Sequence, residues 1–331
     1  MALPRTYTEG FHNLEDVRKM KYVNLGTTGM KVSVLGFGGG CFGNHYGDYD
    51  VEDAKKVVHE ALRRGVNYID TAPFYGEGKS EKTLGEALRN VPRSAYYIAT
   101  KVARYSLDPT RAFDFSYGNV LKSVNESLQR LGLDYVDIIQ VHDVEFAPSV
   151  DIIINQTLPA LYEVVRDGKA RFIGVTGYPL SVLKEVIEKS PVKIDCVLSY
   201  SRLTLMDDTL KDYIPFFKSK DLGIIHASPP ALGLLTNCGS WDWHPGNALY
   251  RELCGKAAQF CKENGVELGN LAVYYTMSQP DVDVHLVGMP TMSHLESNLS
   301  VALNSITQKE KDVLNEIFKR YVERRVLTKT L

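Results

Sequence analysis

RRGVNYIDTAPFYG, residues 63–76, holds the end of one helix, a strand and a turn. Two arginines and a glycine close an amphipathic segment, and glycine readily adopts the left-handed conformation that follows a helix. The run NYIDTA has the length and apolar character of a buried strand, and PFYG is a turn sequence. This order of elements is typical of a parallel α/β protein.

The same unit repeats along the whole chain. Strand-length apolar runs occupy residues 32–38, 67–72, 96–102, 135–142, 171–177, 196–200, 223–229 and 282–288. Amphipathic segments of helix length occupy residues 51–64, 80–89, 117–130, 153–166, 179–189, 207–219, 248–264 and 292–304. Eight alternating pairs predict a parallel sheet that closes on itself, a (β/α)8 TIM barrel.

The segments at either end of this repeat predict additions to the barrel. YVNLGTTGMKVSVL, residues 22–35, is typical of a β-hairpin that could close one barrel end, and residues 307–322 predict an extra C-terminal helix. A chain of 331 residues could hold two domains, but barrels often reach this size as one. We therefore expect a single barrel domain over residues 1–331, with residues 1–20 as an N-terminal extension.

Composition narrows the function classes. The apolar share is 44%, the charged share 24% and the net charge −2, and no basic run offers a surface for nucleic acid or an anionic membrane. The N-terminus lacks the apolar stretch of a secretory signal, so we expect a cytoplasmic protein. The five cysteines form no C-x-x-C pair, which indicates free thiols. These features favour small-molecule chemistry.

Polar residues stand where successive strands end. Asp70 and Tyr75 follow the second run, Lys101 lies near the end of the third and His142 ends the fourth. Catalytic groups of such barrels sit at the C-terminal ends of the strands, so the four should meet. We expect the Lys101 ammonium to lower the pKa of the Tyr75 phenol from about 10, Asp70 to keep Lys101 charged, and His142 to orient a substrate carbonyl.

Each of these residues also has a structural interpretation. Tyr75 is one of nineteen tyrosines, Asp70 could cap a turn, and His142 could be a core histidine. Lys101 is the most informative of the four, because lysine is rarely buried without a partner.

The chain resembles the aldo-keto reductases. DTAPFYG, the Thr100-Lys101 pair and QVHD, residues 140–143, match the aspartate, tyrosine, lysine and histidine tetrad of that superfamily in order, and the resemblance spans residues 21–304. GFGGGCFG, QVHDVEF, GVTGYPL and ASPPALGLLT are most similar to its L-galactose dehydrogenase branch. The resemblance implies hydride transfer between NAD(P)(H) and a carbonyl, alcohol or sugar hemiacetal, with Tyr75 as general acid in reduction and general base in oxidation.

The resemblance also implies where a cofactor and a substrate would bind. Asp70 would reach the nicotinamide ribose, Thr176 and Gly177 the carboxamide, and the loop at 228–233 the pyrophosphate. The implied cofactor residues are Asp70, Thr176, Gly177, Ser199, Ser228, Leu232, Gly233, Gly288, Met289, His294 and Asn298. Residues proposed for the substrate pocket are Phe42, His45, Phe74 and Trp241.

Three departures from the family pattern concern the cofactor. Gly177 replaces the usual asparagine, and Ala227 stands where many members carry an aromatic ring. GMPTMSHLESN, residues 288–298, lacks the lysine and arginine that grip the ribose phosphate of NADPH in many relatives, and His294 falls near the arginine position. These differences favour NAD(H) slightly over NADP(H).

Other readings stay open at the level of sequence. Gly36 and Gly38 begin a G-x-G, but Cys41 occupies the third glycine position, so we expect a tight loop rather than a dinucleotide fingerprint. A cofactor-sensing regulatory subunit with little turnover is one alternative function. A metal-dependent barrel hydrolase is another, although His59-Glu60 is followed by Arg63 where a second histidine ligand would be needed.

Overall fold

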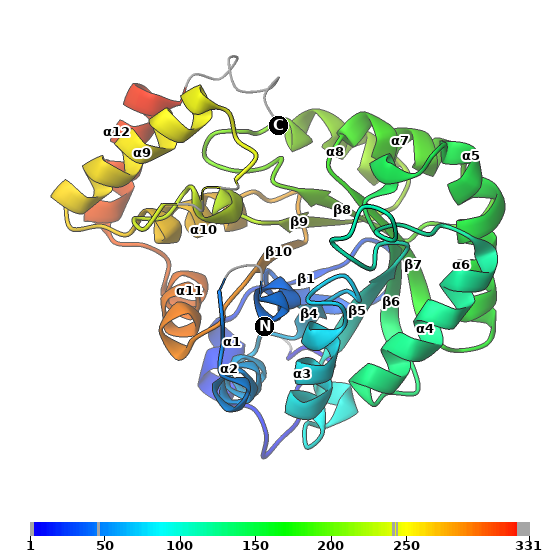
Figure 1. Cartoon of the computed structure of the whole chain (residues 1–331). Helices are drawn as coiled ribbons and strands as arrows, with labels where there is room; N and C mark the ends of the chain where they lie inside the picture. Colours follow the sequence, from blue (N-terminus) through cyan, green and yellow to red (C-terminus); the bar gives the residue numbers. More distant parts are fainter. Residues whose placement is uncertain (1–2, 45–46, 240–241, 243, 323–331) are drawn as a thin grey trace.

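A computed structural model of the chain describes residues 3–44, 47–239, 242 and 244–322. Eight parallel strands in this part of the chain form a closed barrel, in the order β10-β3-β4-β5-β6-β7-β8-β9 (Figure 1). The barrel strands are β3 (Leu35–Gly38), β4 (Tyr68–Asp70), β5 (Tyr97–Val102), β6 (Val136–Val141), β7 (Ala170–Gly177), β8 (Cys196–Tyr200), β9 (Gly223–Ala227) and β10 (Val284–Val287). All eight predicted strands and the predicted TIM barrel are therefore confirmed.

Side chains along each barrel strand point alternately into the barrel and out of it, and those that point inward fill its interior. Tyr68, Tyr97 and Ile138 belong to one buried cluster inside the barrel, together with apolar residues of β8, β9 and β10. Side chains two residues apart on a strand point to the same face. The next inward positions, toward the C-terminal strand ends, are therefore polar: Asp70 on β4 and Lys101 on β5, four residues beyond Tyr97.

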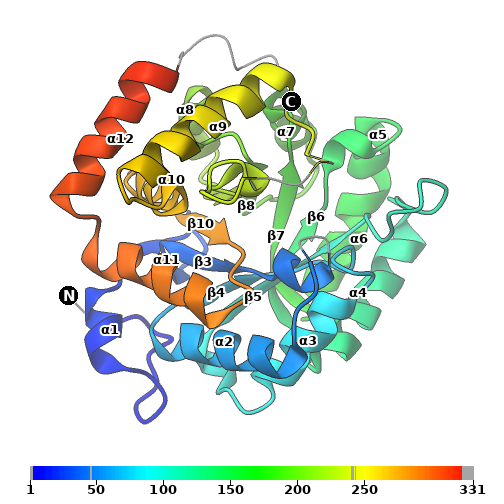
Figure 2. The ribbon, with the colours of Figure 1, turned by 60° about the vertical axis from the view of Figure 1, so that its left-hand side comes forward.

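Helices surround the barrel on its outside (Figure 2). The barrel helices are α2 (Val51–Arg63), α3 (Lys79–Leu88), α4 (Tyr117–Leu131), α6 (Leu158–Arg166), α7 (Leu180–Lys189), α8 (Leu210–Ser219), α10 (Leu268–Met277) and α11 (Met292–Asn304). Short elements complete the connections: α5 (Val150–Ile152), the π-helix η4 (Ile153–Thr157), and the 3-10 helices η1 (Gly39–Gly43), η2 (Arg93–Ala95), η3 (Val144–Phe146) and η5 (Ala231–Gly233).

One helix of the predicted repeat was assigned wrongly. The predicted seventh helix is α9 (Ala248–Glu263), which packs beside α12 (Gln308–Tyr321), the predicted C-terminal helix, outside the ring (Figure 2). The true seventh barrel helix is α10, which precedes β10. Its sequence, LGNLAVYYTM, is apolar almost all round, so it lacks the 3.6-residue pattern by which the other helices were recognised.

The predicted hairpin closes the N-terminal end of the barrel. β1 (Tyr22–Asn24) pairs antiparallel with β2 (Lys31–Ser33), and Leu25 and Met30 enter the inner cluster fully buried. Gly26 has a φ of +47°, and a Cβ there would lie 2.3 Å from the backbone nitrogen of Gly223 at the start of β9. Only glycine lets the turn approach the barrel this closely.

The N-terminal extension packs on the barrel, and the cysteines form no disulfide bonds. The N-terminal extension contains α1 (Leu14–Lys19), which is tied to the barrel by the Asp16–Arg64 ion pair. All five cysteines are free thiols, as predicted, and Cys238 alone among them is exposed. No helix in the described ranges is long and apolar enough to span a membrane.

Candidate active site

The polar layer inside the barrel brings the predicted residues together. Asp70, Lys101 and His142 lie at the C-terminal ends of β4, β5 and β6, and Tyr75 reaches them from the turn after β4. Gln140 joins the layer, two residues before His142 on the same face of β6. The buried apolar cluster inside the barrel lies directly beneath this polar layer.

Lys101 is the centre of the layer. Its ammonium group donates to the Asp70 carboxylate, to the Thr71 carbonyl (2.9 Å) and to the Tyr75 hydroxyl oxygen (3.2 Å). The second Asp70 oxygen accepts from Gln140 Nε2 at 2.8 Å. An ammonium can only donate, so the Tyr75 oxygen must accept, and the Tyr75 O–H is left to donate elsewhere.

The pKa values differ in one respect from the expectation. Burial raises the pKa of Tyr75 to about 12, and Lys101 acts in the expected lowering direction but is outweighed. Burial also lowers the pKa of Lys101, yet Asp70 and Tyr75 together raise it above its ordinary value. The phenol is therefore protonated and the lysine charged at neutral pH.

His142 is held neutral beside Tyr75. Burial, with the positive charges of Lys101 and Arg104, puts its pKa well below the ordinary value for histidine. Its ring meets the Tyr75 ring edge-on, with 5.8 Å between centroids. A neutral imidazole carries one N–H that can donate a hydrogen bond to a carbonyl oxygen, and it lacks the second, acidic proton of the imidazolium form.

The glycine-rich segment after β3 positions Tyr75. A Cβ on Gly43 would lie 2.9 Å from the Gly76 nitrogen and 3.0 Å from the Tyr75 carbonyl carbon, and one on Gly40 would contact the Tyr75 ring at 3.7 Å. Ser80 Oγ donates to the Gly39 carbonyl at 2.8 Å. The cluster therefore lets η1 pack directly on the turn that carries the phenol.

A charged pair flanks the tetrad on the β5 and β6 side. Arg104 forms an ion pair with Asp143 and lies over the Phe74 ring, 3.7 Å from its centroid. The Phe74 ring in turn lies 5.8 Å from the His142 ring and 6.1 Å from the Tyr75 ring. Asp143 Oδ2 is 3.8 Å from His142 Nε2.

The predicted carboxamide residues, Thr176 and Gly177, lie next to this pair at the end of β7. Thr176 Oγ1 accepts from the Asp143 N–H at 3.1 Å. The space beside Gly177 holds the Glu145 carboxylate, with Oε2 at 2.6 Å from where a Cβ would stand. Burial and Asp143 raise the pKa of Glu145 to about 7, and its Oε1 accepts from the Tyr178 N–H at 3.0 Å.

Several buried polar atoms here have no partner in the described part of the chain. They are Gln140 Oε1, His142 Nδ1, Glu145 Oε2, Ser199 Oγ and Ser201 Oγ. A buried polar group without a hydrogen bond costs free energy. Their concentration at the ends of β6 and β8 fits a polar ligand that supplies the missing bonds, as a nicotinamide carboxamide and ribose would.

The predicted pyrophosphate loop is tightly wound. Ser228 and Leu232 both have positive φ, 66° and 55°, and Ser228 Oγ accepts from the Leu232 N–H at 2.9 Å. The Gly233 N–H donates to the Pro230 carbonyl at 3.0 Å. His244 Nε2 is 2.9 Å from the Ala231 carbonyl oxygen and fixes the following segment to this loop.

The residues predicted for the far end of the cofactor lie at β10 and α11. Met289 is fully buried, whereas Gly288 is exposed. A Cβ placed on Gly288 would lie 3.4 Å from the Cβ of Cys41. His294 is exposed in the first turn of α11, where its Nδ1 is 2.6 Å from Thr291 Oγ1, and Asn298 Nδ2 donates to its carbonyl at 2.7 Å.

Of the four residues predicted for the substrate pocket, only Phe74 is seen to lie beside the tetrad. Phe74 lies beside Tyr75 and His142, as described above. Phe42 is completely buried, and among the described residues its ring lies beside those of Phe37 and Tyr49. His45 and Trp241 fall outside the described residues.

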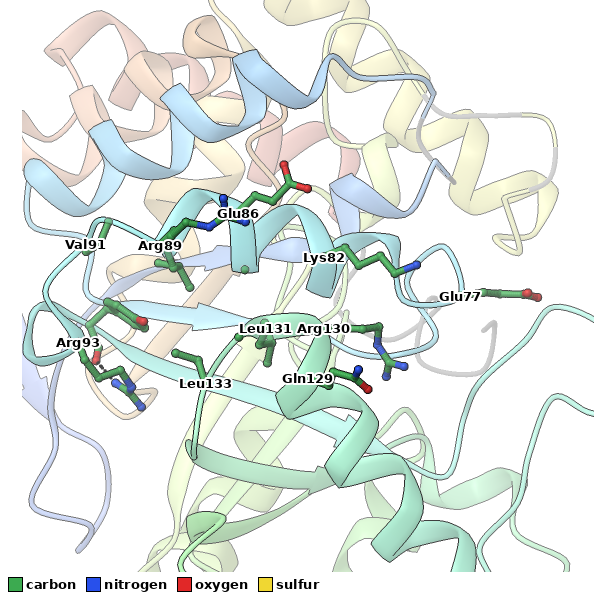
Figure 3. Close-up of a pocket in the computed structure, with 14 residues that line it drawn as sticks. Glu77, Lys82, Glu86, Arg89, Val91, Arg93, Gln129, Arg130, Leu131 and Leu133 are labelled. Atoms are coloured by element: carbon green, nitrogen blue, oxygen red, sulfur yellow. Dashed lines mark hydrogen bonds between the residues drawn. The ribbon is translucent and has the colours of Figure 1, made fainter.

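A surface groove of about 770 Å³ lies away from the tetrad, between α3 and α4 (Figure 3). Lys82 of α3 and Arg89, just beyond the end of α3, line one side, and Gln129 and Arg130 of α4 line the other (Figure 3). None of the four tetrad residues lines this groove, so we do not assign the chemistry to it. Among the described residues, no group of three or more His, Cys, Asp or Glu side chains is arranged to hold a metal ion.

Three residues of the site were missed in the sequence. Gln140 follows from strand alternation, because it lies two positions before His142. Arg104 and Glu145 lie in loops beyond β5 and β6, and their place beside the tetrad depends on loop paths that no periodic pattern gives.

Comparison with known proteins gives the same family at several levels. Residues 34–319 match the model of the Aldo/keto reductase family. The chain is 42% identical to L-galactose dehydrogenase of Arabidopsis thaliana, over 90% of this chain and 93% of that protein. It is 32% identical to D-arabinose 1-dehydrogenase of Saccharomyces cerevisiae, over 75% and 76%. A solved aldo-keto reductase of Bacillus halodurans, in its holo form, superimposes with a TM-score of 0.72 at 26% identity, covering 92% of this chain and 99% of that one.

Proposed function

The chain belongs to the aldo/keto reductase family of oxidoreductases, and from this premise we propose that it oxidises an aldose at C1 with a nicotinamide cofactor. The two curated relatives named above are an L-galactose dehydrogenase and a D-arabinose 1-dehydrogenase. The observation that supports the proposal best is the Asp70–Lys101–Tyr75 chain of contacts beside a neutral His142.

The chemistry divides between the cofactor and the protein. A bound nicotinamide would accept the hydride from C1 of the sugar, and the anomeric hydroxyl would lose its proton, so that a lactone forms. In reduction the protonated phenol of Tyr75 gives its proton to the carbonyl oxygen, and in oxidation Tyr75 Oη takes the proton of the sugar as a phenolate, after its own proton has left to solvent. Lys101 stabilises the phenolate that forms, Asp70 keeps Lys101 charged, and His142 orients the oxygen that reacts.

The residues at the strand ends suit a nicotinamide. Thr176, Ser199 and Glu145 would hold the carboxamide, since the last two carry buried oxygen atoms without partners among the described residues. Gly177 leaves room for Glu145 at the position where many relatives have asparagine. Asp70 would stand below the nicotinamide ribose.

We further propose a preference for NAD(H) over NADP(H). Residues 288–298 carry no lysine or arginine, and His294 is engaged with Thr291. A ribose phosphate carries nearly two negative charges and needs cations or several donors to replace its hydration. In a fluorescence titration we expect NADH to bind at least about ten times more tightly than NADPH. Tighter binding of NADPH would contradict the preference.

A spectrophotometric assay tests the proposed reaction. Purified protein is supplied with NAD⁺ and L-galactose, and reduced cofactor is followed with lactone formation. We expect stoichiometric lactone and NADH, with D-arabinose as a second substrate. Cofactor binding without turnover of any aldose or simple aldehyde would refute the proposal and favour a cofactor-sensing role.

A further inference from the structure

The ion pair between Arg104 and Asp143 is surrounded by aromatic rings, which an ion pair that only joins two loops would not need. The guanidinium lies over Phe74 and is flanked by Phe113 and Phe146, at 5.4 and 5.7 Å from their ring centroids. Those two rings are themselves stacked, with 4.8 Å between centroids. The aromatic rings therefore hold one planar cation in a fixed orientation at the edge of the catalytic layer.

The backbone is strained at or next to both members of the pair. Ala103, immediately before Arg104, has a φ of +81°, and Asp143 has a φ of +51°. Neither is glycine, and side chains with a Cβ are strained in this region of φ. The Asp143 N–H donates to Thr176 Oγ1 at 3.1 Å, and the Ala103 N–H donates to the Tyr105 hydroxyl at 2.9 Å, which stabilises both strained residues. Strain kept at two neighbouring strand ends indicates a functional constraint.

The pair also keeps hydrogen-bonding capacity. Arg104 Nη1 and Asp143 Oδ2 bond to each other, while Arg104 Nε is buried without a partner in the described part of the chain. A guanidinium offers five donor hydrogens and a carboxylate about four acceptor sites, so one contact leaves most of both unused. The side chains remain 26% and 16% exposed, against 6% for His142, so the pair is accessible where His142 is nearly closed off.

We propose that Arg104 and Asp143 read the hydroxyl groups next to the reacting carbon and so select polyhydroxylated substrates over plain aldehydes. The inference rests on the proposed function and deepens it. Adjacent hydroxyls both donate and accept, which matches a donor-only cation beside an acceptor-only anion. The pair carries no net charge, so it favours a neutral polyol over an anionic substrate, which Asp143 would repel.

The selectivity follows from the cost of leaving the pair unsatisfied. A site built to bond substrate hydroxyls rejects an analogue that lacks them, because its buried polar groups then lose water without replacement. Propanal would place a methyl-bearing chain against Arg104 and Asp143. Glyceraldehyde has the same three carbons and adds two hydroxyls, so the two aldehydes form a matched pair of probes.

The test compares NADH-dependent reduction of glyceraldehyde and propanal by the wild-type protein, Arg104→Met, Asp143→Asn and Arg104→Lys. We expect the wild type to favour glyceraldehyde in kcat/KM by about 100-fold or more. Arg104→Met and Asp143→Asn should reduce this ratio to below about 5, because KM for glyceraldehyde rises far more than KM for propanal. Arg104→Lys, which keeps the charge but not the planar fork, should give an intermediate ratio.

Arg93→Met is the matched control. Arg93 also pairs with a buried aspartate, Asp137 (2.7 Å), and also lies over aromatic rings, those of Tyr96 and Tyr135, but it precedes β5 at the opposite end of the barrel. Asp137 keeps a second partner in Arg171. This variant should retain the wild-type ratio.

Each outcome has a separate meaning. Equal losses for both aldehydes, or weaker NADH binding in the Arg104 and Asp143 variants, would mean that the pair only shapes the loops and would overturn the inference. An unchanged ratio in those variants would overturn it as well. A wild-type protein that oxidises aldoses but does not prefer glyceraldehyde overturns the inference alone, whereas one that transfers no hydride overturns the proposed function and the inference with it.

Discussion

Lys101 illustrates how a single residue links burial to chemistry. Its side chain is 2% exposed, and the charge is kept because Asp70 and Tyr75 offset the effect of burial on its pKa. A buried ion pair adds little net stability, because desolvation of both charges offsets their attraction. The pair is therefore best explained by what it does to Tyr75.

A double-mutant cycle on this pair tests that explanation. Lys101→Met leaves the Asp70 carboxylate buried with only the Gln140 amide, and we expect the free energy of unfolding to fall by about 3–5 kcal/mol. Lys101→Met combined with Asp70→Leu removes both charges and should recover at least half of that loss. Urea unfolding of the wild-type protein, Lys101→Met, Asp70→Leu and the double variant measures the four stabilities of the cycle. Additive losses in the double variant would contradict the view that the pair is maintained for catalysis.

The sequence predicted the four residues of the tetrad but not their electrostatics. Their positions follow from strand ends, which apolar runs mark well. The raised pKa of Tyr75 does not, because it depends on the extent of burial around the phenol, and burial at a barrel mouth is set by loops. Arg104 and Glu145 were missed for the same reason.

At the scale of elements, the contact between η1 and the turn after β4 sets the position of Tyr75. Gly43→Ala should reduce kcat at least about 10-fold, because the new methyl group meets backbone atoms that cannot move aside without displacing the phenol. Steady-state kinetics and circular dichroism together measure the effect. We expect a folded protein with lower turnover.

Gly255→Ala controls for the loss of a glycine. This residue is exposed within α9, with no atom within 4 Å of its absent Cβ, so alanine should raise stability by about 0.5–1 kcal/mol and leave turnover unchanged. If Gly43→Ala keeps wild-type kcat, the packing of η1 does not position Tyr75.

Strands were easier to predict than helices here. Barrel strands are buried on both faces and read as continuous apolar runs, so all eight were found. Helices were recognised in the sequence by the alternation of an apolar face with a polar face every 3.6 residues. α10 is covered on most sides by its neighbours, and it was overlooked in favour of α9, whose pattern is clear but whose place lies outside the ring.

At the scale of the whole molecule, we propose that the barrel, its hairpin and the outer helices form one cooperative unit. Leu25 and Met30 of the hairpin share an inner cluster with residues of β4 to β10, and α12 packs against α9. Sequence length alone allowed two domains. A single domain is favoured because segments far apart in the sequence are buried in the same apolar clusters.

Buried histidines make the stability of this unit depend on pH. Burial holds the pKa of His285 at about 3 and that of His226 well below its ordinary value, and the two rings lie 5.7 Å apart on β10 and β9. Below about pH 6.5 the unfolded chain binds protons that the folded protein excludes, so stability falls as pH falls. Glu145 acts in the opposite direction, since its raised pKa favours the folded state below about pH 7.

We expect these two histidines, together with the buried His142, to outweigh Glu145. The urea midpoint at pH 5.5 should be lower than at pH 7.5, with one transition at both pH values, and His285→Gln should narrow the difference. Equal midpoints for the wild-type protein, or a second transition, would contradict this description.

The most direct test of the central claim, that Tyr75 carries the proton in hydride transfer, is the turnover of Tyr75→Phe at saturating cofactor and sugar. The substitution removes one oxygen and keeps the ring that packs against His142. We predict a loss of at least about 1,000-fold in kcat, with the NADH dissociation constant within about twofold of wild type. Turnover within tenfold of wild type would show that another group moves the proton and would contradict the assignment.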